Sequence, residues 1–80
     1  MYKVYVIQSK IDYRFYVGLT QNINRRVSEH NFGFVFSTKG YKPWKLVYFE
    51  DAENRTLARK REKYLKSGCG KEFLKSFIPQ

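Results

Sequence analysis

The chain has 80 residues, which predicts one domain over residues 1–80. Sixteen Lys and Arg against seven Asp and Glu give a formal net charge of +9, which favours a polyanionic partner over a membrane. The single cysteine, Cys69, excludes an intramolecular disulfide framework and a cysteine-based zinc site. No apolar run reaches the roughly 18 residues of a membrane span, so we expect a cytoplasmic monomer that has no disulfide partner and does not contact a membrane.

Two β-type segments open the chain. Residues 2–8 are rich in aromatic and β-branched residues and predict a central strand covered on both faces. A polar loop over residues 9–13 leads to a predicted return strand over residues 14–18. This hairpin would bring Tyr5 and Tyr16 close to cross-strand opposition. Gly18 would end the second strand or permit a close approach to it.

A short helix follows over residues 23–31, with Thr20 or Asn22 as its cap. At 100° per residue, Arg26 and His30 fall one turn apart at the edge of its apolar face. The pair is either a solvated one or a phosphate-handling one.

Residues 32–43 predict a loop that interleaves aromatic rings with lysines. This composition suits nucleic acid, although the rings could equally tuck under the domain. A third strand over residues 44–50, a helix over 53–66 with Asp51 or Asn54 near its cap, and a terminal helix over 70–77 complete the pattern. The fold class is therefore α+β: a small three-stranded antiparallel sheet flanked by helices, in the order β-β-α-β-α-α.

The periodicity also predicts a core. The apolar positions expected to be largely buried are Val4, Val6, Ile7, Val17, Ile23, Val27, Leu46, Val47, Leu57, Leu65 and Leu74. The inner stripe of the helix over 53–66 is expected to hold Leu57, Ala58, Arg61, Tyr64 and Leu65.

The spacing of several residues resembles that of the GIY-YIG nuclease family, especially its small single-domain bacterial members. The two signatures read Lys3-Val4-Tyr5 and Tyr16-Val17-Gly18, with their tyrosines eleven positions apart. Arg26 follows Tyr16 by ten positions and His30 follows Arg26 by four, as in the family. The stretches 37–48 and 61–68 are also similar to the small bacterial members.

The resemblance implies a metal-dependent endonuclease that hydrolyses phosphodiester bonds in DNA, at structured or damaged sites, with RNA as a further possibility. By position, the catalytic residues would be Tyr5, Tyr16, Arg26 and His30. Glu62 would hold Mg²⁺ or Mn²⁺, an ion that one or two carboxylates commonly bind together with substrate phosphate. Glu50 and Asp51 are its rivals as the metal-binding carboxylate.

The charge distribution supplies candidate nucleic-acid contacts. Eight of the sixteen basic residues lie after residue 54. The expected contact residues are Arg25, Lys39, Lys42, Arg59, Arg61 and Lys66. A module of the same fold that binds nucleic acid but cuts weakly or not at all is the alternative function.

Overall fold

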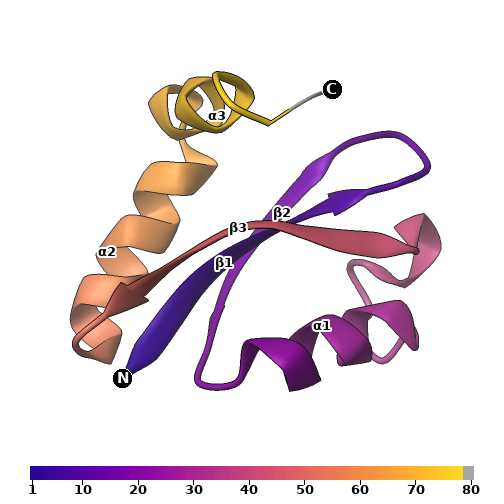
Figure 1. Cartoon of the computed structure of the whole chain (residues 1–80), viewed down its shortest axis with the longest axis horizontal. Helices are drawn as coiled ribbons and strands as arrows, with labels where there is room; N and C mark the ends of the chain where they lie inside the picture. The colour runs from indigo at the N-terminus through magenta and orange to yellow at the C-terminus, as the bar shows by residue number, and fades with distance from the viewer. Residues whose placement is uncertain (79–80) are drawn as a thin grey trace.

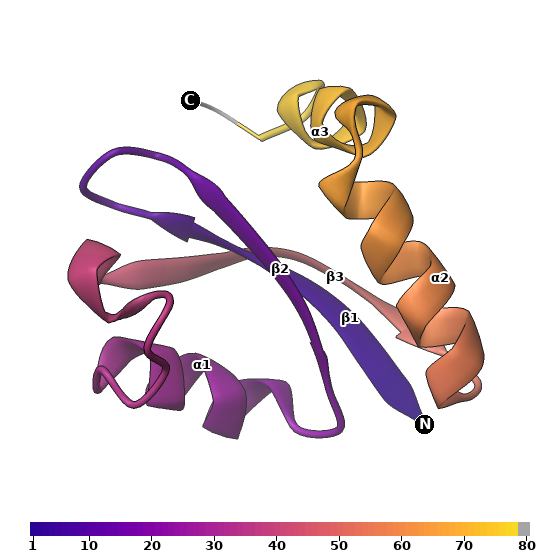
Figure 2. The ribbon, with the colours of Figure 1, turned by 180° about the vertical axis from the view of Figure 1, so that it is seen from behind.

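The computed structural model describes residues 1–78 as a sheet between two helical layers (Figure 1). In chain order the elements are β1 (Tyr2–Ser9), β2 (Phe15–Thr20), α1 (Ile23–Asn31), the short 3-10 helix η1 (Lys39–Tyr41), β3 (Trp44–Ala52), α2 (Arg55–Lys66) and α3 (Gly68–Lys75). Opposite views place α1 on one side of the sheet and α2 with α3 on the other (Figure 1 and Figure 2). The predicted α+β class and element order are confirmed.

The sheet has the order β2-β1-β3, and both pairs of neighbours are antiparallel. The near-continuous apolar run of β1 makes it the central strand, buried from Val4 to Ser9. Because side chains alternate along a strand, Val4 and Val6 face α2 and α3 whereas Tyr5 and Ile7 face α1. Since β1 is central in the order β2-β1-β3, β2 is an edge strand.

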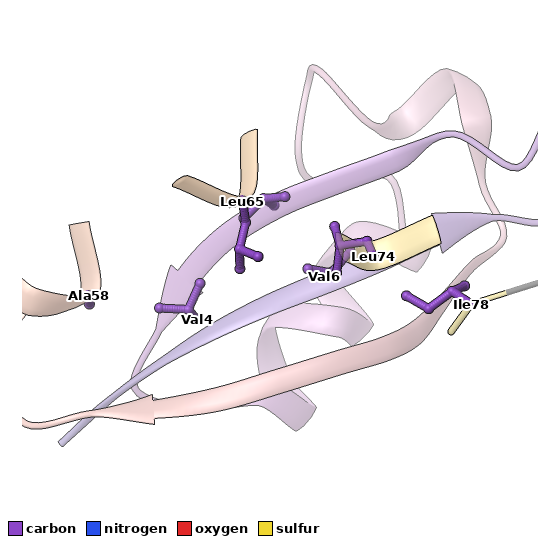
Figure 3. Close-up of a cluster of buried hydrophobic side chains, with 7 residues drawn as sticks. Val4, Val6, Ala58, Leu65, Leu74 and Ile78 are labelled. Atoms are coloured by element: carbon purple, nitrogen blue, oxygen red, sulfur yellow. The ribbon is translucent and has the colours of Figure 1, made fainter. Parts of the chain in front are cut away.

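The larger core lies between the sheet and the helices α2 and α3. Val4, Val6 and Val17 of the sheet meet side chains of the two helices and of the segment after α3, namely Ala58, Leu65, Leu74 and Ile78 (Figure 3). A β-carbon on Gly70 would lie 2.1 Å from the Tyr64 carbonyl oxygen, so α3 can pack this closely on the end of α2 only with glycine there.

A smaller aromatic core lies under α1. Tyr5, Ile7 and Trp44 are buried there, and Ile23, Val27 and Leu46 pack against them while remaining partly exposed. The predicted burial is thus confirmed for Val4, Val6, Ile7, Val17, Leu65 and Leu74. Ile23, Val27 and Leu46 are only partly buried, because a nine-residue helix covers little of that face. Val47, which packs against the larger core on the other face, is also only partly buried.

The predicted inner stripe of α2 is wrong at three positions. Leu57 is 45% exposed, Tyr64 is 40% exposed and the Arg61 side chain is 37% exposed, whereas Ala58 and Leu65 are fully buried. The helix meets the sheet along the narrow line from Ala58 to Leu65, and Leu57 lies beside that line. Periodicity locates the apolar side of a helix but not the width of its contact.

Element ends differ from the predictions by one or two residues. The cap alternatives resolve to Asn22, whose side chain accepts from Arg25 N at 3.1 Å, and Asn54, which accepts from Leu57 N at 2.9 Å. β2 runs to Thr20, beyond the predicted end at Gly18. The predicted terminal helix begins earlier, at Gly68, because the Ser67 side chain accepts from Gly70 N at 3.2 Å and caps it.

Candidate active site

Tyr5 lies across the edge strand at Gly18. The two residues are paired in the β1–β2 ladder, and a β-carbon on Gly18 would lie 2.6 Å from the Tyr5 hydroxyl oxygen. Any side chain at Gly18 would therefore collide with the phenol. The close approach expected at Gly18 is made by the tyrosine of the neighbouring strand, whose ring extends over β2 toward the free edge of the sheet.

Tyr16 lies on the same face of the sheet but not opposite Tyr5. Its ladder partner is Ile7, so the two tyrosines are diagonal neighbours, two positions apart in register. The predicted near-opposition is corrected accordingly. The link between them is His30, whose ring centroid lies 5.9 Å from that of Tyr5 and 5.0 Å from that of Tyr16, edge-on in both cases.

His30, in the last turn of α1, is fully buried and hydrogen-bonded at both ring nitrogens. Nε2 lies 2.9 Å from the Tyr5 hydroxyl and Nδ1 lies 2.8 Å from Thr38 Oγ1. The Thr38 hydroxyl has an acceptor in the Val35 carbonyl oxygen at 3.4 Å. We infer that Thr38 donates to Val35 and accepts from Nδ1–H, which leaves Nε2 to accept the Tyr5 proton.

The electrostatic environment keeps His30 neutral. Burial and, to a smaller extent, the positive charge of Arg26 lower the pKa of its imidazole to about 4, against a smaller opposing effect of Glu29. Burial also raises the pKa of the Tyr5 hydroxyl to about 12. The hydrogen-bonding and charge of Arg26 oppose that rise, which places the guanidinium beside the phenol.

Arg26 lies one helical turn before His30 and keeps part of its side chain in solvent. Nη1 donates to Glu29 Oε1 at 2.9 Å, and this hydrogen bond is the main reason that the pKa of the guanidinium is raised. The side chain is 36% exposed. Arg26 therefore lies beside the Tyr5 phenol while retaining donors that an anion in solvent can reach.

Glu62 approaches the same place from the other layer. Its helix α2 packs on β1 and β2, and its carboxylate is one of the charges that raise the pKa of Tyr5. The Glu62 side chain is 16% exposed and accepts from Lys66 Nζ at 3.2 Å. A direct hydrogen bond joins Tyr5 to His30, whereas Glu62, on the helix that covers the opposite face of the sheet, is linked to Tyr5 through its charge.

The rival carboxylates are engaged elsewhere. Glu50 accepts from Arg61 Nε at 2.7 Å and from the Tyr48 hydroxyl at 3.1 Å. Asp51 forms an ion pair with Lys3. Within residues 1–78 no group of three or more His, Cys, Asp or Glu side chains could hold a metal ion alone. An ion at Glu62 would need oxygen ligands from water and from a bound phosphate.

Two residues of this site were not predicted from the sequence. Thr38 is 1% exposed and orients His30, and Trp44 donates from Nε1 to the Thr38 carbonyl oxygen at 2.9 Å. Thr38 lies in an irregular connection, where no periodicity marks a buried position. Its presence in the stretch that resembles the small bacterial family members was the one signal.

The six basic candidates differ in their surroundings. Arg25, Lys39, Lys42 and Arg59 are exposed, and Lys66 is half-exposed beside Glu62. Arg61 instead lies between Glu50 and the rings of Tyr64 and Phe73, with its guanidinium carbon 4.7 Å and 5.7 Å from their centroids. The sequence did not anticipate this structural contact.

A hollow of about 260 Å³ lies along the same edge of the sheet. It is lined by β2 residues and by α2 and α3 residues that include Tyr16, Lys66 and Lys71. Lys66 and Lys71 therefore extend positive charge from the site toward α3.

Among residues 1–78, no helix combines the length and the apolar character that crossing a bilayer requires.

Comparison with known proteins identifies the family to which the chain is similar. Residues 1–73 match the model of the GIY-YIG catalytic domain. A UPF0213 protein of Clostridium perfringens is 44% identical over 64 residues, which span 79% of this chain and 68% of that protein. A UPF0213 protein of Haloquadratum walsbyi is 40% identical over 65 residues, spanning 80% and 72% of the two chains.

A solved structure is similar as well. The solution structure of a UPF0213 protein from Bacillus halodurans matches with a TM-score of 0.57 and 31% identity, over 95% of this chain and 84% of that one. With this match and the family match over residues 1–73, the chain belongs to the GIY-YIG catalytic-domain family, a family of nuclease type.

Proposed function

We propose that the protein is a metal-dependent endonuclease acting on DNA, at nicks, flaps or other irregular structures. The observation that carries the proposal is the Tyr5–His30 hydrogen bond beside Arg26, with the charge of Glu62 acting on the same tyrosine. Only the folded chain brings these groups together, since they come from β1, α1 and α2. A set with a phosphate-binding cation, a proton-accepting pair and one carboxylate suits hydrolysis of a phosphodiester.

Arg26 would hold the scissile phosphate. A guanidinium offers a planar fork of donors that matches two phosphate oxygens, and part of this one is open to solvent. Glu29 accepts a hydrogen bond from Arg26 Nη1 and fixes the orientation of the guanidinium. Because negative charge builds on the phosphate oxygens during attack, this contact would strengthen in the transition state.

The Tyr5–His30 pair would handle the proton of the attacking water. Tyr5 alone is a poor base, since burial keeps its hydroxyl protonated. Its own proton lies on the hydrogen bond to His30 Nε2, however. As the Tyr5 oxygen takes a proton from the attacking water, Tyr5 could give its own proton to His30 Nε2. Thr38 would accept from Nδ1–H of the resulting imidazolium.

The residues present fit a divalent ion of the magnesium type. Glu62 would hold it through one carboxylate, with water and substrate phosphate as the other ligands. When bound, such an ion would stabilise negative charge on the leaving oxygen. Lys66, which pairs with Glu62 in the free protein, is exposed enough to release the carboxylate.

The proposal is tested by incubating the protein with a panel of nicked, flapped and mismatched DNAs, with Mg²⁺ or Mn²⁺ and with EDTA. We expect cleavage that needs the metal and that Glu62→Gln abolishes, while DNA binding survives because the substitution removes a negative charge facing phosphate. Glu72→Gln, on an exposed carboxylate of α3, is the control. Binding without cleavage under all these conditions would support the non-cutting module instead.

A further inference from the structure

Three phenylalanines project from the connection between α1 and η1. Phe32, Phe34 and Phe36 are 71%, 76% and 86% exposed, and we call them the phenylalanine loop. Single exposed apolar residues are ordinary on a protein surface. Three rings within five residues, each more than two-thirds in solvent, are a patch that folding alone does not account for. The alternative that the rings of this connection tuck under the domain is therefore wrong for the phenylalanines but holds for Tyr41, which packs against the smaller core.

The backbone beneath these rings is held in place. Phe32 N donates to Ser28 O at 2.8 Å and Phe34 N donates to Glu29 O at 3.0 Å, which ties the loop to the last turns of α1. Further along, Thr38 N and Lys39 N both donate to Val35 O, at 3.1 Å and 3.0 Å. The rings are therefore presented by a fixed backbone, so little conformational entropy would be lost when something stacks on them.

The surroundings of the rings are basic. Between Glu29 and Glu50 the sequence holds three lysines and no Asp or Glu. Lys39 Nζ lies 5.1 Å from the Phe36 ring centroid. Lys42 Nζ lies close to Gly33, the residue that separates Phe32 from Phe34 in the sequence. The Phe32 and Phe34 ring centroids are 5.9 Å apart with their planes tilted by 35°, so the two rings contact each other and a flat partner would stack on an exposed outer face. Flat apolar faces beside positive charge match a nucleobase and its phosphate.

We propose that the phenylalanine loop is a stacking platform for unpaired nucleobases. Every base has an aromatic face, whereas paired bases in a duplex have theirs covered, so such a platform selects single-stranded nucleic acid. The loop joins the end of α1 that carries His30 to Thr38, which orients His30. The platform therefore lies next to the proposed catalytic group. On the proposed function, it directs cleavage to phosphates beside unpaired nucleotides.

The test measures binding in EDTA, so that it does not depend on cleavage. The probes are a twelve-nucleotide single strand, its duplex, and a twelve-unit abasic strand that keeps the phosphates and lacks the bases. The variant Phe34→Leu/Phe36→Leu retains apolar volume but removes two π faces. Phe77→Leu, which alters a 49% exposed ring on the other side of the sheet, is the matched control.

We expect wild type to bind the single strand more tightly than the abasic strand. The leucine variant should lose about 5- to 150-fold of single-strand affinity for each base unstacked, with unchanged affinity for the abasic strand and the duplex. Phe77→Leu should behave as wild type. Equal affinity of wild type for the base-bearing and abasic strands, or an equal loss on all three probes, would overturn the proposal.

A spectroscopic variant removes the dependence on affinity alone. Trp44, the one tryptophan of the chain, is 4% exposed, so Phe36→Trp adds an exposed reporter on the platform. Its emission should be quenched by the single strand and not by the abasic strand, because stacking requires the base. If neither the single strand nor the abasic strand changes the emission, and the leucine variant instead changes the oligomeric state, the patch docks protein and the proposal is wrong. Cleavage that persists in that case leaves the nuclease proposal intact.

Discussion

The two faces of the sheet use the same strand for different purposes. Toward α2 and α3, β1 presents Val4 and Val6 to a core of small aliphatic side chains. Toward α1 it presents Tyr5, whose ring is in contact with an imidazole hydrogen-bonded at both nitrogens. The first face needs apolar volume of the right size, whereas the second needs particular donors and acceptors. The difference teaches that the aliphatic core and the proposed active site lie largely on different sides of one strand.

The largest effect should come from Arg26. Arg26→Ala should reduce single-turnover cleavage by about 10³-fold or more, because the guanidinium would contact charge that grows in the transition state. Its unfolding free energy should fall by about 1 kcal/mol or less, since the ion pair of Arg26 with Glu29 is partly exposed. Arg55→Ala, which removes an exposed arginine at the start of α2, is the control. Similar rates for the two variants would argue against a role for Arg26 at the phosphate.

The opposite result is expected on the aliphatic face. Leu65→Ala should lower the unfolding free energy by about 2–5 kcal/mol, because Leu65 is fully buried in the larger core. Leu57→Ala, on the same helix but 45% exposed, should cost about 0.5 kcal/mol or less. Urea titration checks both. Equal losses would mean that Leu57 contributes to the core after all.

The aromatic face should give stability a pH dependence. The pKa of His30 is about 4 in the folded chain and near 6.5 when unfolded, so the unfolded state binds more protons between these values. Stability should be flat above about pH 6.5 and fall by roughly 3 kcal/mol as the pH is lowered to about 4. His30 is the one histidine, so His30→Gln should flatten the upper part of this fall. An unchanged profile would show that another group titrates there.

A smaller effect is expected at Thr38. Thr38→Val keeps the shape but leaves His30 Nδ1 without its partner, at a cost of about 1–3 kcal/mol. The nitrogen chemical shifts of the His30 ring should change toward a mixture of tautomers. Thr56→Val, at an exposed position of α2, should change neither quantity. Unaltered ring shifts in Thr38→Val would mean that Thr38 does not select the tautomer.

The sequence predicts much of this comparison but not its geometry. The near-continuous apolar run of β1 and the periodicity of the helices identify the strands and the helices, because these signals are local. The candidate residues from Tyr5 to His30 are identified by their spacing, which resembles that of the GIY-YIG family. The diagonal placement of Tyr5 and Tyr16 depends on the ladder register, which the hairpin sequence leaves open by two residues. Thr38 and the exposed phenylalanines lie in an irregular connection, where contacts are decided by tertiary packing.

The central claim is that phosphate and metal meet at the β2 edge, and paramagnetic broadening by Mn²⁺ tests it most directly. The measurement records backbone amide signals of the protein with a non-hydrolysable oligonucleotide as Mn²⁺ is added. The account predicts that broadening begins at Glu62 and Gly18 and disappears in Glu62→Gln. Broadening centred on Glu50 or Asp51, with Glu62 and Gly18 left sharp, would contradict it.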